Sequence, residues 1–122
     1  MQQRAGESFS RSSRLTHADD YRHVFAKNLR VSDDCFTLLV GKQRGQRPRI
    51  GFAIAKKQIR RAVDRNRLKR LIRESFRHHQ HELPALDTVV MVRQRILKLN
   101  NQQIFSRLDK HWQKIIHQCA AC

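Results

Sequence analysis

The sequence predicts an α+β fold, a single sandwich in which helices pack on one sheet. Its length of 122 residues suits one ordinary domain. Apolar residues recur at helical spacing in three stretches and in strand-like runs in others. These stretches follow one another in the order helix, strands, helix, strand, helix. We expect the folded domain at 14–118, between a flexible basic tail at 1–13 and a C-terminal tail at 119–122.

Three stretches have the composition of strands. Residues 35–40 and 49–55 are rich in apolar residues, and a polar loop at 41–48 would join them in a hairpin. Residues 86–93 form a nearly continuous apolar run, which is typical of a strand with both faces covered. We therefore expect these strands in a sheet that helices cover.

Three helices are expected around the strands. The first covers residues 17–27, and the longest covers about 61–82 and ends before Pro84. The last begins near Asn100 or Asn101, either of which can cap it. The apolar stripes that should face the core are Tyr21, Val24 and Phe25; Leu68, Leu71, Ile72 and Phe76; and Phe105, Leu108, Trp112, Ile115, Ile116 and Cys119.

The charge balance indicates a polyanionic partner. Lysine and arginine number 26 against 10 acidic residues, which gives a net charge of +16. This excess destabilises the compact chain by self-repulsion, and binding to nucleic acid relieves that repulsion. Arginine is the commoner cation, and its guanidinium binds phosphates and base edges through paired hydrogen bonds. No stretch is apolar enough for a membrane span or a signal peptide, so we expect a cytoplasmic protein and no membrane partner.

The longest expected helix has a charged face opposite its apolar stripe. A solvated face usually mixes charge signs, yet residues 56–77 contain only Asp64 and Glu74 as acids. We name the charged face the cationic ridge, and it comprises Asn66, Lys69, Arg70, Arg73 and Arg77. Further cations surround the start of the helix: Lys56, Lys57, Arg60, Arg61, Arg65 and Arg67. The helical phase of Arg65 lies near the apolar stripe, so this side chain could instead turn back as a strap on the helix N-terminus.

Aromatic residues offer a second candidate surface, where the first helix meets the sheet. Tyr21, Phe25, Phe36 and Phe52 could stack on unpaired bases there. The same spacing is equally typical of core aromatics, so the periodicity leaves both interpretations open.

The sequence contains no pattern that indicates protein catalysis or a metal centre. The carboxylate pairs Asp19-Asp20 and Asp33-Asp34 are adjacent, and adjacent side chains diverge rather than converge on an ion. The Cys119-Ala-Ala-Cys122 motif supplies half of a structural zinc site and lacks a second pair. The histidines at 78, 79 and 81 are better explained as a basic helix end. We therefore expect no catalytic residues, no metal and no cofactor on the protein itself.

One stretch carries a specific resemblance. Residues 49–57 and 60–77, with the core Arg65-Asn66-Arg67-x-Lys69-Arg70 after a Lys56-Lys57 pair, are similar to the bacterial ribonuclease P protein family. The gammaproteobacterial members are the most similar, and the resemblance extends from about Leu15 to Trp112.

The resemblance implies a fold and a function. The fold would have αβββαβα topology, with a central mixed sheet and a left-handed crossover between parallel strands. Members of the family bind a large catalytic RNA, about one protein per RNA, and that RNA holds the required Mg²⁺ ions. The complex removes the 5′ leader from precursor tRNA, and the protein contacts the leader. This chain would then be the non-catalytic subunit of an endoribonuclease.

The resemblance also assigns roles to residues. With the flanking Arg60, Arg61 and Arg77, the expected contacts to the catalytic RNA are Arg65, Asn66, Arg67, Lys69, Arg70 and Arg73. The expected leader cleft is lined by Tyr21, Phe25 and Phe36, with Lys56 and Lys57 at its rim.

Two features of this sequence depart from the family pattern. Leu39 stands where some members carry a second cleft aromatic, which weakens the expectation of stacking there. The family sheet has four strands, and a short strand at 29–31 would supply the one that composition does not reveal.

Three other functions remain open from the residues. A ribosomal or other structural RNA-binding protein fits the composition equally well. A protein-only nuclease is disfavoured by the lack of an acidic cluster. Binding to duplex DNA is separable from RNA binding only by measurement, because phosphate contacts serve both.

Overall fold

The computed structural model describes residues 13–42 and 45–120, and the chain order of its elements confirms the expected αβββαβα topology. A short 3₁₀ helix, η2, precedes the last helix. The elements are α1 (Ala18–Ala26), β1 (Asn28–Ser32), β2 (Phe36–Gly41), β3 (Arg49–Phe52), α2 (Ala62–His79), β4 (Asp87–Val92), η2 (Gln94–Lys98) and α3 (Asn101–Ala120).

The four strands form one mixed sheet in the order β1-β2-β4-β3. β1 and β4 both pair with β2 in antiparallel fashion, whereas β3 pairs with β4 in parallel. The hairpin expected between residues 35–40 and 49–55 is therefore wrong, because β4 lies between β2 and β3. A parallel pair needs a long crossover connection, and α2 provides it between β3 and β4. The left-handed sense of this crossover remains an expectation from the resemblance.

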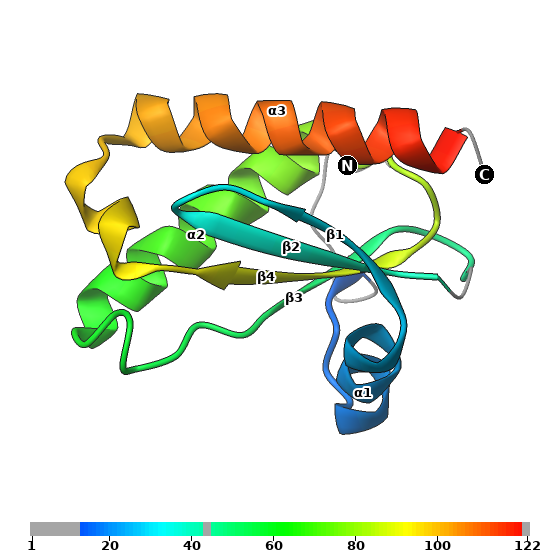
Figure 1. Ribbon diagram of the computed structural model, residues 1–122, viewed down its shortest axis with the longest axis horizontal. Helices are drawn as coiled ribbons and strands as arrows, with labels where there is room; N and C mark the ends of the chain where they lie inside the picture. Colours follow the sequence, from blue (N-terminus) through cyan, green and yellow to red (C-terminus); the bar gives the residue numbers. More distant parts are fainter. Residues whose placement is uncertain (1–12, 43–44, 121–122) are drawn as a thin grey trace, which may run out of the picture.

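Helices cover the sheet unequally on its two faces. α2 and α3 pack together over one face, and α1 lies against the other (Figure 1). The larger core lies under α2 and α3, where Phe36 and Leu38 of β2 meet Ile72 of α2 and Trp112 of α3. On the opposite face, Val24 of α1 packs with a much smaller apolar cluster: Leu15, Leu39 and Val89. The short α1 thus leaves part of its face of the sheet uncovered.

Several expected boundaries shift in the structure. The strand expected at 29–31 is present as β1, whereas the strand expected at 49–55 ends at Phe52. α3 continues to Ala120, and Cys119 belongs to the core cluster. The domain therefore extends past residue 118, and the boundary expected there is wrong because the helix and its apolar stripe do not end at that point. The tail expected at 1–13 lies almost entirely outside the described residues.

The α2–α3 contact contains one buried polar link. The indole Nε1 of Trp112 donates a hydrogen bond of 2.7 Å to Ser75 Oγ, and both residues are buried. A hydrogen bond between buried groups fixes the relative position of two helices, because either group alone would lose its bond to water.

No helix in the described part of the chain is long and apolar enough to cross a membrane.

We predict that Ser75→Ala lowers the free energy of unfolding by about 1–3 kcal/mol, because the indole N–H of Trp112 is left unpaired in the core. Urea unfolding followed by the fluorescence of Trp112, the single tryptophan, measures the change. Ser106→Ala, on an exposed position of α3, is the matched control. Equal unfolding midpoints for the two variants would contradict the importance of this link.

Candidate nucleic-acid interface

The outward side of α2 and the segment that enters it form a cationic surface. Lys56, Lys57, Arg60 and Arg61 are exposed before and at the start of the helix, and Asn66 and Arg70 are exposed along it. Among the described residues, none of these six side chains has a hydrogen-bond or ion-pair partner within the protein. Their charges and donors are therefore available to a polyanion, as expected for the cationic ridge and its surroundings.

Arg65 turns back toward the chain that precedes its helix. Its Nη1 donates hydrogen bonds of 2.9 Å each to the carbonyl oxygens of Ile59 and Arg60. The side chain is half-buried, whereas Asn66 beside it is exposed. This is the strap that the helical phase of Arg65 suggested.

Two further cations in the predicted set bind protein groups. Arg67 Nη2 donates a 2.6 Å hydrogen bond to Asn101 Oδ1 at the start of α3. Arg77 makes an ion pair of 2.7 Å with Glu74, and its hydrogen bond is the main reason that the pKa of Glu74 lies below its usual value. Lys69 is half-buried beside them. These side chains belong to the surface but are less free than Arg70.

Arg73 departs from the cationic ridge. Its guanidinium lies 5.1 Å from the centre of the Phe52 ring on β3, a cation–π contact. Burial lowers the pKa of Arg73, and the neighbouring charge of Arg14 lowers it further. The helical phase of Arg73 places it on the flank of the ridge, where the edge of the sheet is within reach. It therefore packs on the protein and does not point outward with Arg70.

An open groove of about 420 Å³ lies on the face of the sheet that α1 only partly covers. Its floor includes Thr37 and Leu39 of β2 and Met91 of β4. Phe25 at the end of α1, Arg30 and Arg93 contribute to its walls. The remaining lining residues are Ala53, Ala55, Gln58 and Val92. An apolar floor with cations at the edges suits an unpaired nucleic-acid strand, which has flat bases and a charged backbone.

The three aromatics expected in the cleft have three different environments. Phe25 is 47% exposed at the groove and is free to contact a ligand. Tyr21 is half-buried, and its hydroxyl accepts from Phe52 N at 3.1 Å and donates to the Leu15 carbonyl at 3.3 Å. Gly51 permits this position of the ring, since a Cβ there would lie 2.5 Å from the hydroxyl. Tyr21 thus holds α1 against the edge strand.

The expectation that Phe36 lines the cleft is wrong. Phe36 is 0% exposed and lies in the core under α2 and α3, where its ring packs edge-on against His111. Side chains alternate between the faces of a strand, so Thr37 and Leu39 face the groove and Phe36 does not.

Sequence reasoning missed several groove residues. Arg30 lies on the short β1, Arg93 follows β4, and Gln58 lies in the segment before α2. The side chain of Gln58 accepts a 3.0 Å hydrogen bond from Gln94 N, which ties that segment to the end of β4. Only the four-stranded pairing brings these positions together, so no local pattern could have indicated them.

The comparisons with known proteins decide the family. The family model described as Ribonuclease P matches residues 9–116. This chain belongs to the ribonuclease P protein family. The ribonuclease P protein component of Thioalkalivibrio sulfidiphilus is 44% identical over 93% of this chain and 95% of its own length. That of Vibrio parahaemolyticus is 43% identical over 88% of this chain and 92% of its own.

Solved structures agree with the sequence relatives. The RNase P protein of Staphylococcus aureus superposes with a TM-score of 0.75 at 29% identity, covering 84% of this chain and 94% of that one. The Thermotoga maritima protein gives 0.73 at 25%, covering 84% and 96%. The chain is thus a subunit of an endoribonuclease that processes tRNA, and the family expected from the Arg-Asn-Arg stretch is confirmed.

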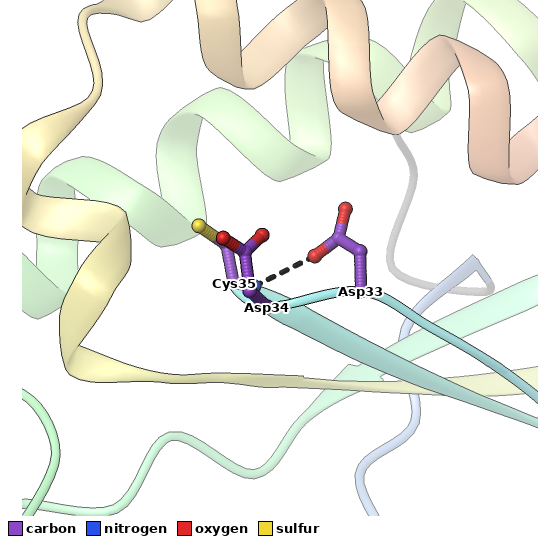
Figure 2. Close-up of side chains that lie close together, drawn as sticks. All are labelled: Asp33, Asp34 and Cys35. Carbon is purple, nitrogen blue, oxygen red and sulfur yellow. Dashed lines mark hydrogen bonds between the residues drawn. The ribbon is translucent and has the colours of Figure 1, made fainter.

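The acidic turn between β1 and β2 is the one place in the described ranges where three possible metal ligands gather. Oxygen and sulfur atoms of Asp33, Asp34 and Cys35 lie within 4.8 Å of one another. Figure 2 shows the carboxylate of Asp33 accepting a hydrogen bond from the backbone N–H of Cys35, and the sulfur of Cys35 points away from that carboxylate. Asp33 also pairs with His111 at 2.8 Å, and Asp34 pairs with Arg95 and Arg107. In the ribonuclease P protein this turn therefore binds α3 and η2 through ion pairs.

The ion pairs of the turn change the acidity of its groups. Burial raises the pKa of Asp33, but hydrogen bonds from the Cys35 and Phe36 amides and from His111 outweigh it, so the net shift is downward. The hydrogen bond from Arg107 lowers the pKa of Asp34. Burial raises the pKa of the Cys35 thiol, which disfavours the thiolate that a metal ion would bind.

We predict that Asp33 stabilises the fold at neutral pH and loses this effect in acid. Its folded pKa lies below its ordinary value near 3.8, so the stabilisation is complete above that value and disappears as the pH falls through the lower one. The free energy of unfolding of Asp33→Asn should therefore approach that of the unmodified protein below about pH 4. Denaturant unfolding at a series of pH values measures both proteins, and a difference that stays constant from pH 7 to pH 3 would contradict the assignment.

Proposed function

We propose that this subunit binds the RNA of ribonuclease P through the start and outward side of α2 and holds the 5′ leader of precursor tRNA in the groove beside α1. The observation that carries the proposal is the position of the 53–61 segment. Its first part lines the groove with Ala53, Ala55 and Gln58, and its last part carries Arg60 and Arg61 into α2. One continuous segment thus connects the two surfaces.

The α2 surface fits a structured RNA. Arg60 and Arg61 are exposed cations at the start of the helix, Arg70 is an exposed cation further along it, and each can contact a phosphate. The amide N–H groups of the first turn add donors at the positive end of the helix dipole. Asn66 lies among these cations and has an amide that can donate to and accept from a base edge or a 2′-hydroxyl.

The groove fits a single strand. Leu39 and Met91 provide an apolar floor, on which bases can lie without sequence-specific hydrogen bonds. Phe25 offers an exposed ring at one side, and Arg30 and Arg93 offer charge for the backbone. Leu39 in place of an aromatic means that Phe25 supplies the stacking.

The chemistry belongs to the RNA subunit in this proposal. Mg²⁺ bound by that RNA supports the hydrolysis, and the protein contributes affinity by neutralising phosphates at both surfaces. About one protein per RNA is sufficient, because one chain carries both surfaces. The proposed site of action is the cytoplasm.

Cleavage of precursor tRNA at low Mg²⁺ by the cognate RNA, with and without this protein, tests the function. The protein should restore cleavage at the mature 5′ end, because its cations replace part of the counterion screening. Failure to do so, with folded protein and an RNA that is active at high Mg²⁺, would contradict the proposal. Cleavage by the protein alone after removal of all RNA would show a protein-only nuclease instead.

We predict that Arg70→Ala weakens binding to the catalytic RNA and lowers the log–log slope of affinity against salt by about one. The physical reason is the loss of one phosphate contact from an exposed side chain without a protein partner. Lys114→Ala, which removes an exposed cation from α3, is the control and should change neither quantity. Equal losses for the two variants would mean that the RNA does not bind along α2.

We predict that Phe25→Ala weakens binding to precursor tRNA by about fivefold to a hundredfold in the holoenzyme, since one base loses its stacking partner. Binding to mature tRNA, which has no leader, should not change. The melting temperature should also be retained, because Phe25 as a residue is 47% exposed. Leu97→Ala, at an exposed apolar residue of η2 outside the groove, is the control. A drop in stability without a selective loss for the precursor would assign Phe25 to packing.

A further inference from the structure

Both arginines of the Arg65-Asn66-Arg67 core donate hydrogen bonds to protein groups, whereas Asn66 between them is exposed. Arg65 uses Nη1 to bridge the carbonyl oxygens of Ile59 and Arg60, at 2.9 Å each. We propose, building on the function above, that Arg65 is a positioning residue. It holds the segment before α2 so that the exposed cations of that segment face the RNA together.

The segment has few other backbone bonds to hold it. The amides of Gln58 and Ile59 both donate to the Ala55 carbonyl, which closes one turn. Arg61 occupies the N-cap of α2 and makes no side-chain capping bond. Between that turn and the helix, the described backbone hydrogen bonds do not use the carbonyls of Ile59 and Arg60. Arg65 satisfies both of them.

The side chain of Ile59 provides the anchor for this strap. Ile59 is 0% exposed and belongs to the main core, so its carbonyl has a fixed position. A guanidinium that bridges this carbonyl to the next one transmits the fixed position to Arg60. The exposed Arg60 and Arg61 side chains then start from a defined backbone.

Electrostatics explain why a strap is needed. Lys56, Lys57, Arg60 and Arg61 lie within six residues and are all exposed, so in the absence of RNA their charges repel one another. A mobile segment would relieve the repulsion and would lose conformational entropy on binding. Two bonds from a charged donor to neutral carbonyls oppose that motion before RNA arrives.

The same geometry commits two of the five N–H donors of Arg65 to the protein, and the three on Nε and Nη2 are not used by these bonds. Nη1 carries two hydrogens, and the two carbonyls use both. Arg70, one and a half turns further on, has no such partner among the described residues and is exposed. On this helix Arg65 thus organises the surface, whereas the exposed Arg70 is available to bind RNA.

Double-mutant cycles with the full-length protein and its cognate RNA test the inference. We expect Arg65→Met to weaken binding about tenfold, the effect of roughly one charged hydrogen bond. Arg60→Met should add little in the Arg65→Met background, because the Arg60 side chain has already lost its position. Arg70→Met should weaken both backgrounds by the same factor. Amide hydrogen exchange of the free protein should accelerate at 56–61 in Arg65→Met, with the other amides unchanged.

Three results would overturn the inference. The losses from Arg65→Met and Arg60→Met could multiply while exchange at 56–61 stays unchanged, which would make Arg65 a direct phosphate contact. Arg65→Met could bind RNA as tightly as the unmodified protein. Arg65→Lys, which serves if Arg65→Met does not fold, could lose affinity while exchange at 56–61 stays unchanged, which would also make Arg65 a direct phosphate contact. An Arg70→Met variant with normal affinity would instead overturn the proposed function itself.

Discussion

The burial of one stripe of α2 determines the direction of the side chains on that helix. Leu68, Ile72 and Phe76 are almost fully buried against the sheet and α3. A helix that is packed so closely cannot rotate, because rotation would expose these residues and cost several kcal/mol. The opposite face must therefore point outward, and it carries Asn66 and Arg70. The core thus sets the geometry of the proposed RNA-binding surface.

The unequal cover of the sheet creates the second surface. α2 and α3 seal one face, whereas α1 covers only part of the other, next to Val24 and Leu39 (Figure 1). The parallel pairing of β3 with β4 brings the segment before α2 to the end of that open face, where Gln58 bonds Gln94. Groove and ridge consequently meet at one connection. We expect a structural change at either surface to alter the other surface through this segment.

Helical periodicity was sufficient to predict which face of α2 is buried and which is exposed. It was not sufficient for side chains whose position depends on tertiary contacts. The stripe of α2 has one interpretation, so the exposure of Asn66 and Arg70 followed from sequence. All six residues of β2 are buried, so their pattern contains no alternation from which the face of Phe36 could be inferred. Arg73 lies over Phe52 of a strand twenty-one residues earlier, a contact that local spacing does not contain. The short edge strand β1 alternates weakly, and only the family resemblance pointed to it.

We propose that two surfaces of one small domain hold two different RNAs. Photo-crosslinking in the assembled holoenzyme with precursor tRNA tests it most directly, with the photoreactive amino acid placed at position 70 or at position 25. We expect crosslinks from position 70 to the ribonuclease P RNA and from position 25 to the 5′ leader. Crosslinks from both positions to the same RNA, or exchanged targets, would contradict it.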